Sequence, residues 1–260
     1  MKPHLDIRTI LTTSLKRWWQ DFAPITLLGL ALIVGTELVI HAVGANGSTA
    51  ESTGTLVLTA RAFAFLLFFS AVAAATLASR LPLSPRAYIL TGLRGAQPPL
   101  VTGLTVAAGL ICVLIVGQLL ALFLTPLARL LAMPPLLGLV ILWCLAMPVA
   151  AAEKKVPFAA MKRSQQMAWR HMGSLCGLAA IIVALLTLPL MLISLVLYGY
   201  APTPEEARAT LDAMTPATTA FWVGELAVVI LSGILAVIPP AIYIALSDAA
   251  QGRNDPQPLA

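Results

Sequence analysis

The sequence predicts an all-α polytopic membrane protein, with six transmembrane helices and an amphipathic helix at the membrane surface before spans 1, 3 and 5. Of its 260 residues, 59% are hydrophobic and only 10% are charged, and the mean hydropathy is +0.92. A water-soluble domain has about 45–50% apolar and about 25% charged residues. The 16 Lys and Arg and 11 Asp and Glu are too few to cover a globule of this size. This composition excludes a soluble enzyme, a disordered chain and a coiled coil.

The six predicted spans are the apolar stretches that are long enough to cross a membrane. A helix needs about 20 apolar residues to cross a hydrocarbon core about 30 Å thick. The stretches that meet this length are 23–45, 56–79, 100–125, 128–152, 174–200 and 220–247. Pro126 and Arg129 favour a tight turn in the short break between the third and fourth. We therefore expect one membrane domain over 1–248 and a short polar tail over 249–260.

The basic residues predict how the chain is oriented. Thirteen of the 16 Lys and Arg fall in the N-terminal segment, the second–third and fourth–fifth connections, and the tail. Because Lys and Arg concentrate on the cytoplasmic side, both termini are predicted to be cytoplasmic, with the protein in the inner membrane. The net charge of +5 then matches anionic lipid headgroups rather than nucleic acid. The first apolar run, which begins near Phe22, is expected to stay as an anchor and not to act as a cleaved signal.

Two cytoplasmic segments read as amphipathic helices. In the first, the apolar residues recur every three or four positions, at Ile7, Leu11, Leu15, Trp18 and Phe22. In the segment before span 5, Phe158, Met161, Ala168, Trp169 and Met172 share one face. Basic and aromatic residues suit a helix in the headgroup plane. The residues predicted to contact lipid are Lys16, Arg17, Trp18, Trp19, Lys162, Arg163, Trp169 and Arg170.

A shorter segment before span 3 completes a possible threefold pattern. Ser84 can cap a helix, Pro85 suits its first position, and Gly95 and Pro98-Pro99 are expected to end it. The pattern predicts three units, each an interfacial helix followed by a transmembrane hairpin, over 1–79, 80–152 and 153–248. In this alignment the outer two units match through Lys16-Arg17 and Lys162-Arg163, with a two-residue shift after them. The alternative is that basic cytoplasmic loops look amphipathic by chance.

One run of residues resembles the signature of a known family. The run is Met147 to Glu153, then Pro157 to Ser164, then Trp169-Arg170. It is similar to a bacterial multi-pass family that includes the glycerophosphoryl diester phosphodiesterase membrane domain and the YciC-like inner-membrane proteins. The opening Ser14 to Trp19 resembles that family's first unit, and Pro239-Pro240 to Asp248 resembles its C-terminal edge.

The resemblance implies a multi-pass membrane fold but no particular molecular activity. The phosphodiesterase chemistry of the fused relatives belongs to a separate soluble domain, for which this chain has no space. The histidines His4, His41 and His171 are scattered, without a carboxylate cluster to hold a catalytic metal. Cys112, Cys144 and Cys176 lie in apolar runs and read as small hydrophobic residues. We therefore expect no enzyme activity, no cofactor and no metal.

Four ionisable residues are predicted to lie within the membrane, namely Glu37, His41, Arg61 and Glu225. Their depths along the spans agree, because all four fall in the outer third. A charge near the bilayer centre costs about 2.5–3.5 kcal/mol on insertion scales, so such residues have partners or line water. An ion pair between Glu37 and Arg61 across the first hairpin is the natural hypothesis. The group then either fixes helix packing or lines an outward-facing pocket for a proton or a small anionic solute.

These observations favour a non-enzymatic, membrane-organising protein that binds lipid or a partner through its basic helices. The alternative is a small secondary transporter or permease that uses the outer polar residues. A membrane-embedded lipid enzyme is a third possibility, weakened by the lack of a clustered catalytic set. Small residues at Ser70, Ala74 and Ala78, and at Gly173 and Gly177, allow close helix contacts that suit an intramolecular contact, a homo-oligomer or a membrane-protein partner.

Overall fold

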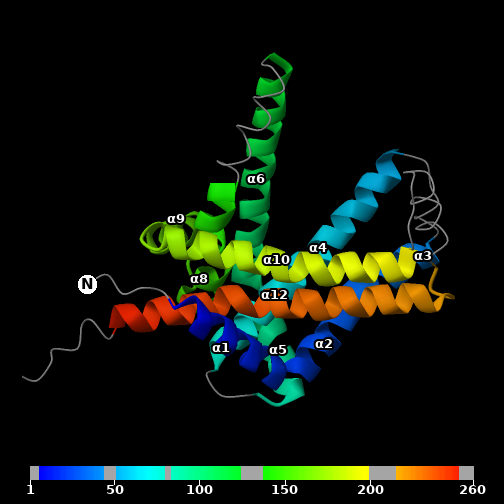
Figure 1. Cartoon of the computed structure of the whole chain (residues 1–260), viewed down its shortest axis with the longest axis horizontal. Coiled ribbons are helices and arrows are strands. Elements are labelled where there is room, and N and C mark those ends of the chain that lie inside the picture. The colour runs from blue at the N-terminus through cyan, green and yellow to red at the C-terminus, as the bar shows by residue number, and fades with distance from the viewer. Residues whose placement is uncertain (1–5, 44–50, 80–82, 124–136, 199–214, 252–260) are drawn as a thin grey trace, which may run out of the picture.

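The computed structural model describes residues 6–43, 51–79, 83–123, 137–198 and 215–251, which form helices and no strand (Figure 1). Its elements are α1 (Ile7–Gln20), α2 (Phe22–Gly29), the π-helical turn η1 (Leu30–Val34), α3 (Gly35–Ala42), α4 (Glu51–Ala78), α5 (Pro85–Gly95), α6 (Gln97–Phe123), α8 (Ala146–Glu153), α9 (Pro157–Trp169), α10 (Met172–Tyr198) and α12 (Thr219–Gln251). A further helical turn over 137–143 leads into α8. The all-α fold class is confirmed for these residues.

Four helices are long and apolar enough to cross a membrane, and they include most of the first, second, third and sixth predicted spans. They are Phe22–Ala42, Gly54–Ala78, Gln97–Val116 and Thr219–Asp248. A fifth is counted if α9 and α10, which are bent by 95° at their junction, form one span. The helical part of the fourth span is shorter, Leu137–Glu153. The number six stays a prediction, because the turn at Pro126, the start of the fourth span and the tail over 252–260 lie outside the described residues.

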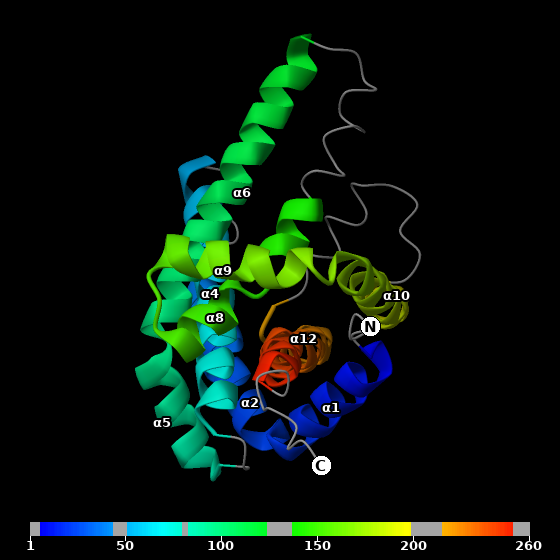
Figure 2. The same cartoon turned by 90° about the vertical axis from the view of Figure 1, so that its left-hand side faces the viewer.

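Three helices form the centre of the molecule. α4, α8 and α12 pack against one another, and each also receives one of the short helices, α5 on α4, α9 on α8 and α1 on α12. α2 lies against α12 and α4, and α6 lies against α8 and α4. Figure 2 shows α1, α5 and α9 on three sides of the end from which it is viewed. In both views α6 runs across α12 and not along it, so the long helices do not form a parallel bundle.

The three short helices bury residues at the same spacing. In each of them, three buried residues are spaced four positions apart. These triplets are Ile10, Ser14 and Trp18 in α1, Tyr88, Gly92 and Ala96 in and after α5, and Ala160, Ser164 and Ala168 in α9. The middle position of each triplet is small. A Cβ on Gly92 would lie 2.7 Å from the carbonyl oxygen of Ala71 in α4, so only a residue without one fits there.

In α1 and α9, the apolar stripe that the sequence predicts is divided between buried and exposed positions. In α1 the protein buries Ile10, Ser14 and Trp18, while Leu15 is 54% exposed. In α9, Phe158 and Trp169 are exposed, and small residues face the core. The shared burial spacing matches Ser14 with Ser164, and the division of the chain into units stays a prediction. The physical reason is that close helix contact selects small side chains, so large apolar residues are left on the outer face.

The predicted start of α5 is confirmed. Ser84 accepts a hydrogen bond from the backbone N–H of Ala87, and Pro85 occupies the first helical position. α5 ends at Gly95, as expected, and Pro98 and Pro99 lie just beyond it in the first turn of α6, where their missing donors cost nothing. Two further adjacent prolines, Pro239 and Pro240, lie inside α12, which continues through them.

The small residues of α4 make an intramolecular contact. Ser70 and Ala74 are buried, and the Cβ of Ala74 lies 3.0 Å from where a Cβ on Gly95 would be. A Cβ on Gly173 in α10 would meet no atom within 4 Å. The close helix approach that the small residues of α4 predict is therefore made within the chain, between α4 and the end of α5.

Candidate functional site

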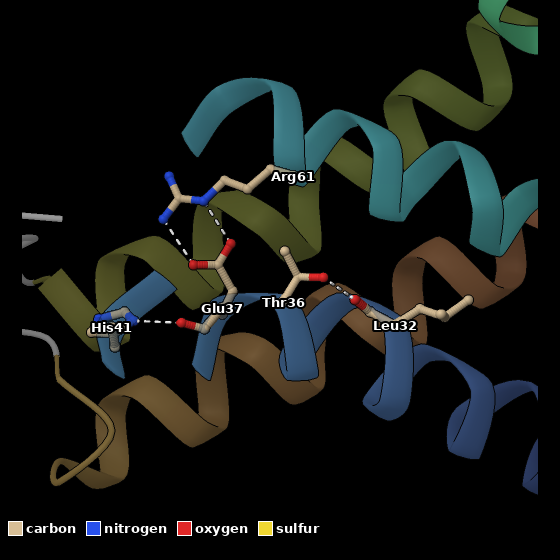
Figure 3. A network of polar contacts seen from close by, with 5 residues as sticks. All are labelled: Leu32, Thr36, Glu37, His41 and Arg61. Atoms are coloured by element: carbon tan, nitrogen blue, oxygen red, sulfur yellow. Dashed lines mark hydrogen bonds and ion pairs between the residues drawn. The ribbon is translucent and has the colours of Figure 1, made fainter. Parts of the chain in front are cut away.

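The candidate site lies at the end of the molecule opposite the start of α1 and the end of α12 (Figure 1), and Figure 3 shows its residues Glu37, His41 and Arg61 from close by. Arg61 of α4 donates from Nε to Oε1 of Glu37 in α3 at 2.6 Å, and from Nη2 to Oε2 at 2.8 Å. Both carboxylate oxygens are therefore held by one guanidinium. Such a two-point contact fixes orientation as well as charge. The side chain of Glu37 is 11% exposed and that of Arg61 is 40% exposed, so the pair lies at the edge of the packed region.

His41 lies one turn after Glu37, and its ring position is set by two contacts. Its Nδ1 lies 2.9 Å from the backbone carbonyl oxygen of Glu37, which can only accept, so Nδ1 carries the hydrogen (Figure 3). The ring meets that of Phe221 edge to face, with centroids 5.2 Å apart.

Glu225 joins this group from α12. It follows Phe221 by one helical turn and therefore lies on the same face of α12. It interacts electrostatically with Glu37, Arg61 and His41. The structure thus brings together the four residues that the sequence placed at one depth. We call Glu37, His41, Arg61 and Glu225 the outer polar cluster.

A turn of π-helix between α2 and α3 positions Glu37. The backbone N–H of Gly35 bonds to the carbonyl oxygen of Leu30, five residues back. Thr36 donates its hydroxyl to the carbonyl oxygen of Leu32 at 2.6 Å (Figure 3). Such a turn inserts one residue into the helix and rotates everything after it. Without this insertion, Glu37 would not face Arg61 of α4, and His41 would not face Phe221 of α12.

The outer polar cluster contains two carboxylates, one guanidinium and one imidazole. This set can hold a proton or interact with a small ion. No group of three or more His, Cys, Asp or Glu in the described part of the chain could hold a metal ion.

A second polar group was missed by the sequence reasoning. Arg17 and Asp21 form an ion pair, with Nε and Oδ2 2.7 Å apart, in the corner between α1 and α2. The contact is an ion pair without hydrogen-bond alignment, and Oδ1 of Asp21 has no hydrogen-bond partner among the described residues. Burial raises the pKa of Asp21, and Arg17 partly opposes this. The sequence feature that could have revealed this pair is an Arg and an Asp four residues apart at the edge of an apolar run.

Tyr88 of α5 lies near the same corner. Its hydroxyl is 3.2 Å from that of Thr76 in α4. Burial raises the pKa of Tyr88, the hydrogen bond with Thr76 opposes this, and the charge of Asp21 adds to the rise. Asp21, Arg17 and Tyr88 therefore belong to one buried polar group, which joins α1, α4 and α5.

The residues of the signature run form a third polar group. Glu153 lies 2.5 Å from Nζ of Lys155 and 3.5 Å from Nε of Arg163, and it accepts a hydrogen bond from the Tyr243 hydroxyl at 3.2 Å. Ser164 donates to the carbonyl oxygen of Leu142 at 2.7 Å, at the break before α8. The chain turns between these contacts at Lys154, whose φ is +49°. The Glu, Arg and Ser of the run thus help to hold α9 against α8 and the residues before it, and Glu153 also links α8 to α12.

The predicted lipid-contacting residues do not all face outward. Lys16, Trp19, Lys162, Trp169 and Arg170 are exposed. Trp18 is a correction: it is buried, with Nε1 3.1 Å from where a Cβ on Gly233 of α12 would lie. Arg17 is a second correction, because its side chain turns inward and pairs with Asp21. Arg163 is half exposed and lies toward Glu153. Helix packing on α12 explains the corrections, since it turns the Arg17–Trp18 side of α1 toward the core.

The fold and its polar groups define the class of protein: an all-α chain with four to five helices that could span a membrane. Comparison with known proteins adds no name to this class, because no protein-family model, curated protein or solved structure is significantly similar to the chain.

Proposed function

We propose that this protein is a non-enzymatic integral membrane protein whose three short helices bind anionic lipid headgroups. The observation that carries the proposal is the outer face of α1, α5 and α9. It combines exposed apolar side chains with basic residues that have no ion-pair partner among the described residues. The exposed apolar residues are Leu15, Trp19, Leu90, Leu93, Phe158 and Trp169, and the basic residues are Lys16, Arg86, Arg94, Lys162 and Arg170.

The position of these helices supports the proposal. All three lie around one end of the molecule, together with the start of α1 and the end of α12 (Figure 2). Aromatic rings and long basic side chains favour the membrane–water boundary, where the apolar part is covered and the polar tip stays wet. In the proposed topology this boundary is the cytoplasmic one, six spans cross the inner membrane, and both termini are cytoplasmic.

We also propose that the chain consists of three copies of one unit. Support comes from the shared burial spacing of α1, α5 and α9, and from the way each packs on a central helix. α5 packs on α4 and α9 packs on α8, which precede them, whereas α1 packs on α12 at the far end of the sequence. The first unit therefore contacts the third, so that the three units form a closed arrangement.

Membership of the family that includes the glycerophosphoryl diester phosphodiesterase membrane domain is part of this proposal. It is supported by the contacts among the signature residues. Glu153 pairs with Arg163, and Tyr243, from the similar C-terminal edge, donates to Glu153. A motif whose members hold one another in place suits a structural role, which agrees with a family defined without a catalytic site.

Lipid retention tests the proposed function directly. The full chain in a neutral detergent is titrated with phosphatidylglycerol or phosphatidylcholine, and bound lipid is counted by native mass spectrometry. We expect more phosphatidylglycerol to be retained, and the triple variant Lys16→Gln/Arg94→Gln/Lys162→Gln to lose that preference. Arg208→Gln, which removes a charge from the predicted outer segment, is the control. Equal retention of both lipids, or an equal loss in the control, contradicts the proposal.

Reporter fusions test the topology. Fusions after Gly47 and Thr210 are expected to report the outer compartment, and fusions after Gly95 and Ala260 the cytoplasm. A reversed result at either pair contradicts the proposed orientation.

The alternative function is a small secondary transporter. It is favoured by the outer polar cluster, because ionisable groups within membrane helices often mark ion and proton pathways. Uptake of a solute into proteoliposomes that is lost in a stably folded Arg61→Lys variant supports this alternative. Lysine retains the charge but cannot form the two-point contact with Glu37.

A further inference from the structure

We propose that Trp19 at the end of α1 and Trp169 at the end of α9 are a matched pair of membrane anchors, whose rings lie at the level of the phospholipid ester groups. The inference rests on the part of the proposed function that places α1 and α9 at a membrane surface. It deepens that function by naming the part of the lipid that two exposed side chains contact. This contact is with uncharged groups, so it is separate from the attraction between basic residues and anionic headgroups.

The two tryptophans occupy equivalent places in two similar corners. Each is the fifth residue after the central serine of its buried triplet, and each lies three residues before the next helix begins, α2 or α10. In both corners the next helix starts with the same backbone hydrogen bond. Ile25 donates to the carbonyl oxygen of Asp21 at 3.1 Å, and Leu175 donates to that of His171 at 3.0 Å. The chain therefore enters the next helix in the same way after both tryptophans.

The packing leaves both indole rings on the surface. Trp19 is 71% exposed and Trp169 is 68% exposed, whereas Trp18 is 9% exposed. Neither exposed indole donates a hydrogen bond to a described residue, whereas Trp222 donates from Nε1 to the carbonyl oxygen of Pro216 at 2.9 Å. An indole N–H can only donate, and acyl chains offer it no acceptor. A large apolar ring with one donor therefore fits the layer where the ester oxygens meet the acyl chains.

The surrounding residues place both rings between charge and hydrocarbon. The ring of Trp19 lies against that of Phe22, with centroids 6.0 Å apart, and Phe22 begins an apolar helix long enough to span a membrane. Lys16, one turn before Trp19, is exposed. In the other corner, α9 carries the exposed Lys162 and Arg170 and bends by 95° into the apolar α10. A helix that follows the membrane surface and then turns into the membrane makes that turn at the boundary, so the bend lies there.

Fluorine NMR on the full chain measures the level of each ring. The protein is produced with fluorotryptophan at its five tryptophans and placed in bilayers of phosphatidylcholine, which has no net charge. Substitution of one tryptophan at a time by Phe assigns the signals, and unchanged positions of the remaining signals show that each variant is folded. A nitroxide attached to the lipid, near the ester groups or near the end of the acyl chain, broadens the signals of nearby rings. A gadolinium chelate in the water broadens the signals of rings that face solvent.

The three probes give a distinct expected result. The signals of Trp19 and Trp169 should be broadened severalfold more by the ester-level nitroxide than by the chain-end nitroxide or the chelate. Trp18 is the matched control, because it is adjacent to Trp19 but packs against Gly233 of α12, and it should broaden less than Trp19 with each lipid nitroxide. The inference is overturned if Trp19 or Trp169 responds most to the chelate or to the chain-end nitroxide, or to none of the probes, or if Trp18 broadens as much as Trp19.

The proposed function and the anchors can fail separately. These bilayers contain no anionic lipid, so the broadening does not depend on the preference for phosphatidylglycerol that tests the basic residues. Loss of that preference with intact ester-level broadening rejects the lipid selectivity and leaves the anchors in place. A clear preference for phosphatidylglycerol, with both rings broadened most by the chelate, rejects the anchors alone.

Discussion

Arg17 donates from Nη2 to the backbone carbonyl oxygen of Ser79, at a distance of 2.9 Å. Ser79 directly follows α4, the second helix of the first hairpin, whereas Arg17 lies in the helix that precedes that hairpin. The same guanidinium pairs with Asp21 in the corner between α1 and α2. One side chain therefore joins both ends of the first hairpin.

Arg17→Ala should destabilise the protein strongly. The side chains of Arg17 and Asp21 are 13% and 1% exposed, so the substitution leaves a buried carboxylate without its counter-charge. Breaking a buried pair by removing one partner costs about 3–5 kcal/mol. Lys16→Ala, at the exposed neighbouring position, should change the free energy of unfolding by less than about 0.5 kcal/mol. Unfolding in mixed micelles measures both values, and similar losses in the two variants contradict the assignment.

Asp21 should make stability depend on pH in acid. Burial raises the pKa of Asp21 in the folded protein above its usual value of about 4. The folded state then binds the proton more tightly than the unfolded state. This contribution is fully present below pH about 4, and it is lost as the pH rises through the higher pKa of the folded state. Asp21→Asn should lack this part of the pH profile, measured by thermal unfolding; an unchanged profile contradicts the prediction.

Gly92→Ala should loosen the contact between α4 and α5. The added Cβ would lie 2.7 Å from the carbonyl oxygen of Ala71, which is backbone and cannot rotate away. Overpacking of this kind costs about 1–3 kcal/mol. Gly173→Ala is the matched control, because its Cβ would meet no atom within 4 Å and alanine favours a helix. The control should be neutral or stabilising in the same unfolding measurement, and a neutral Gly92→Ala contradicts the close approach.

Ser164→Ala should weaken the attachment of α9. The hydroxyl makes a buried hydrogen bond to the carbonyl oxygen of Leu142 at 2.7 Å, and its loss leaves that carbonyl unsatisfied. The expected loss is about 1–3 kcal/mol in the free energy of unfolding. Thr105→Ala removes a hydroxyl that bonds within its own exposed helix and should change stability much less. Equal effects of the two substitutions argue against a special role for Ser164.

Particular residues show how far the sequence could predict the site. Glu37, His41, Arg61 and Glu225 were found from sequence, because an ionisable residue in an apolar run is rare and its depth follows from the rise of a helix. The Arg17–Asp21 pair was not found, because it lies at the edge of the run, where charges are ordinary. Trp18 and Trp19 are adjacent and chemically identical, yet one is buried and the other exposed.

The sequence by itself determined the helical class, the apolar segments and the cap of α5, since these depend on local composition and on the fixed periodicity of a helix. Only the tertiary structure decided which face of each short helix turns inward. That choice depends on close contact with α4, α8 and α12, where small residues such as Gly92 and Ser164 fit and large ones do not. It also decided that Glu37 and Arg61 form a two-point contact, because depth gives the level of each residue but not the direction in which its side chain points.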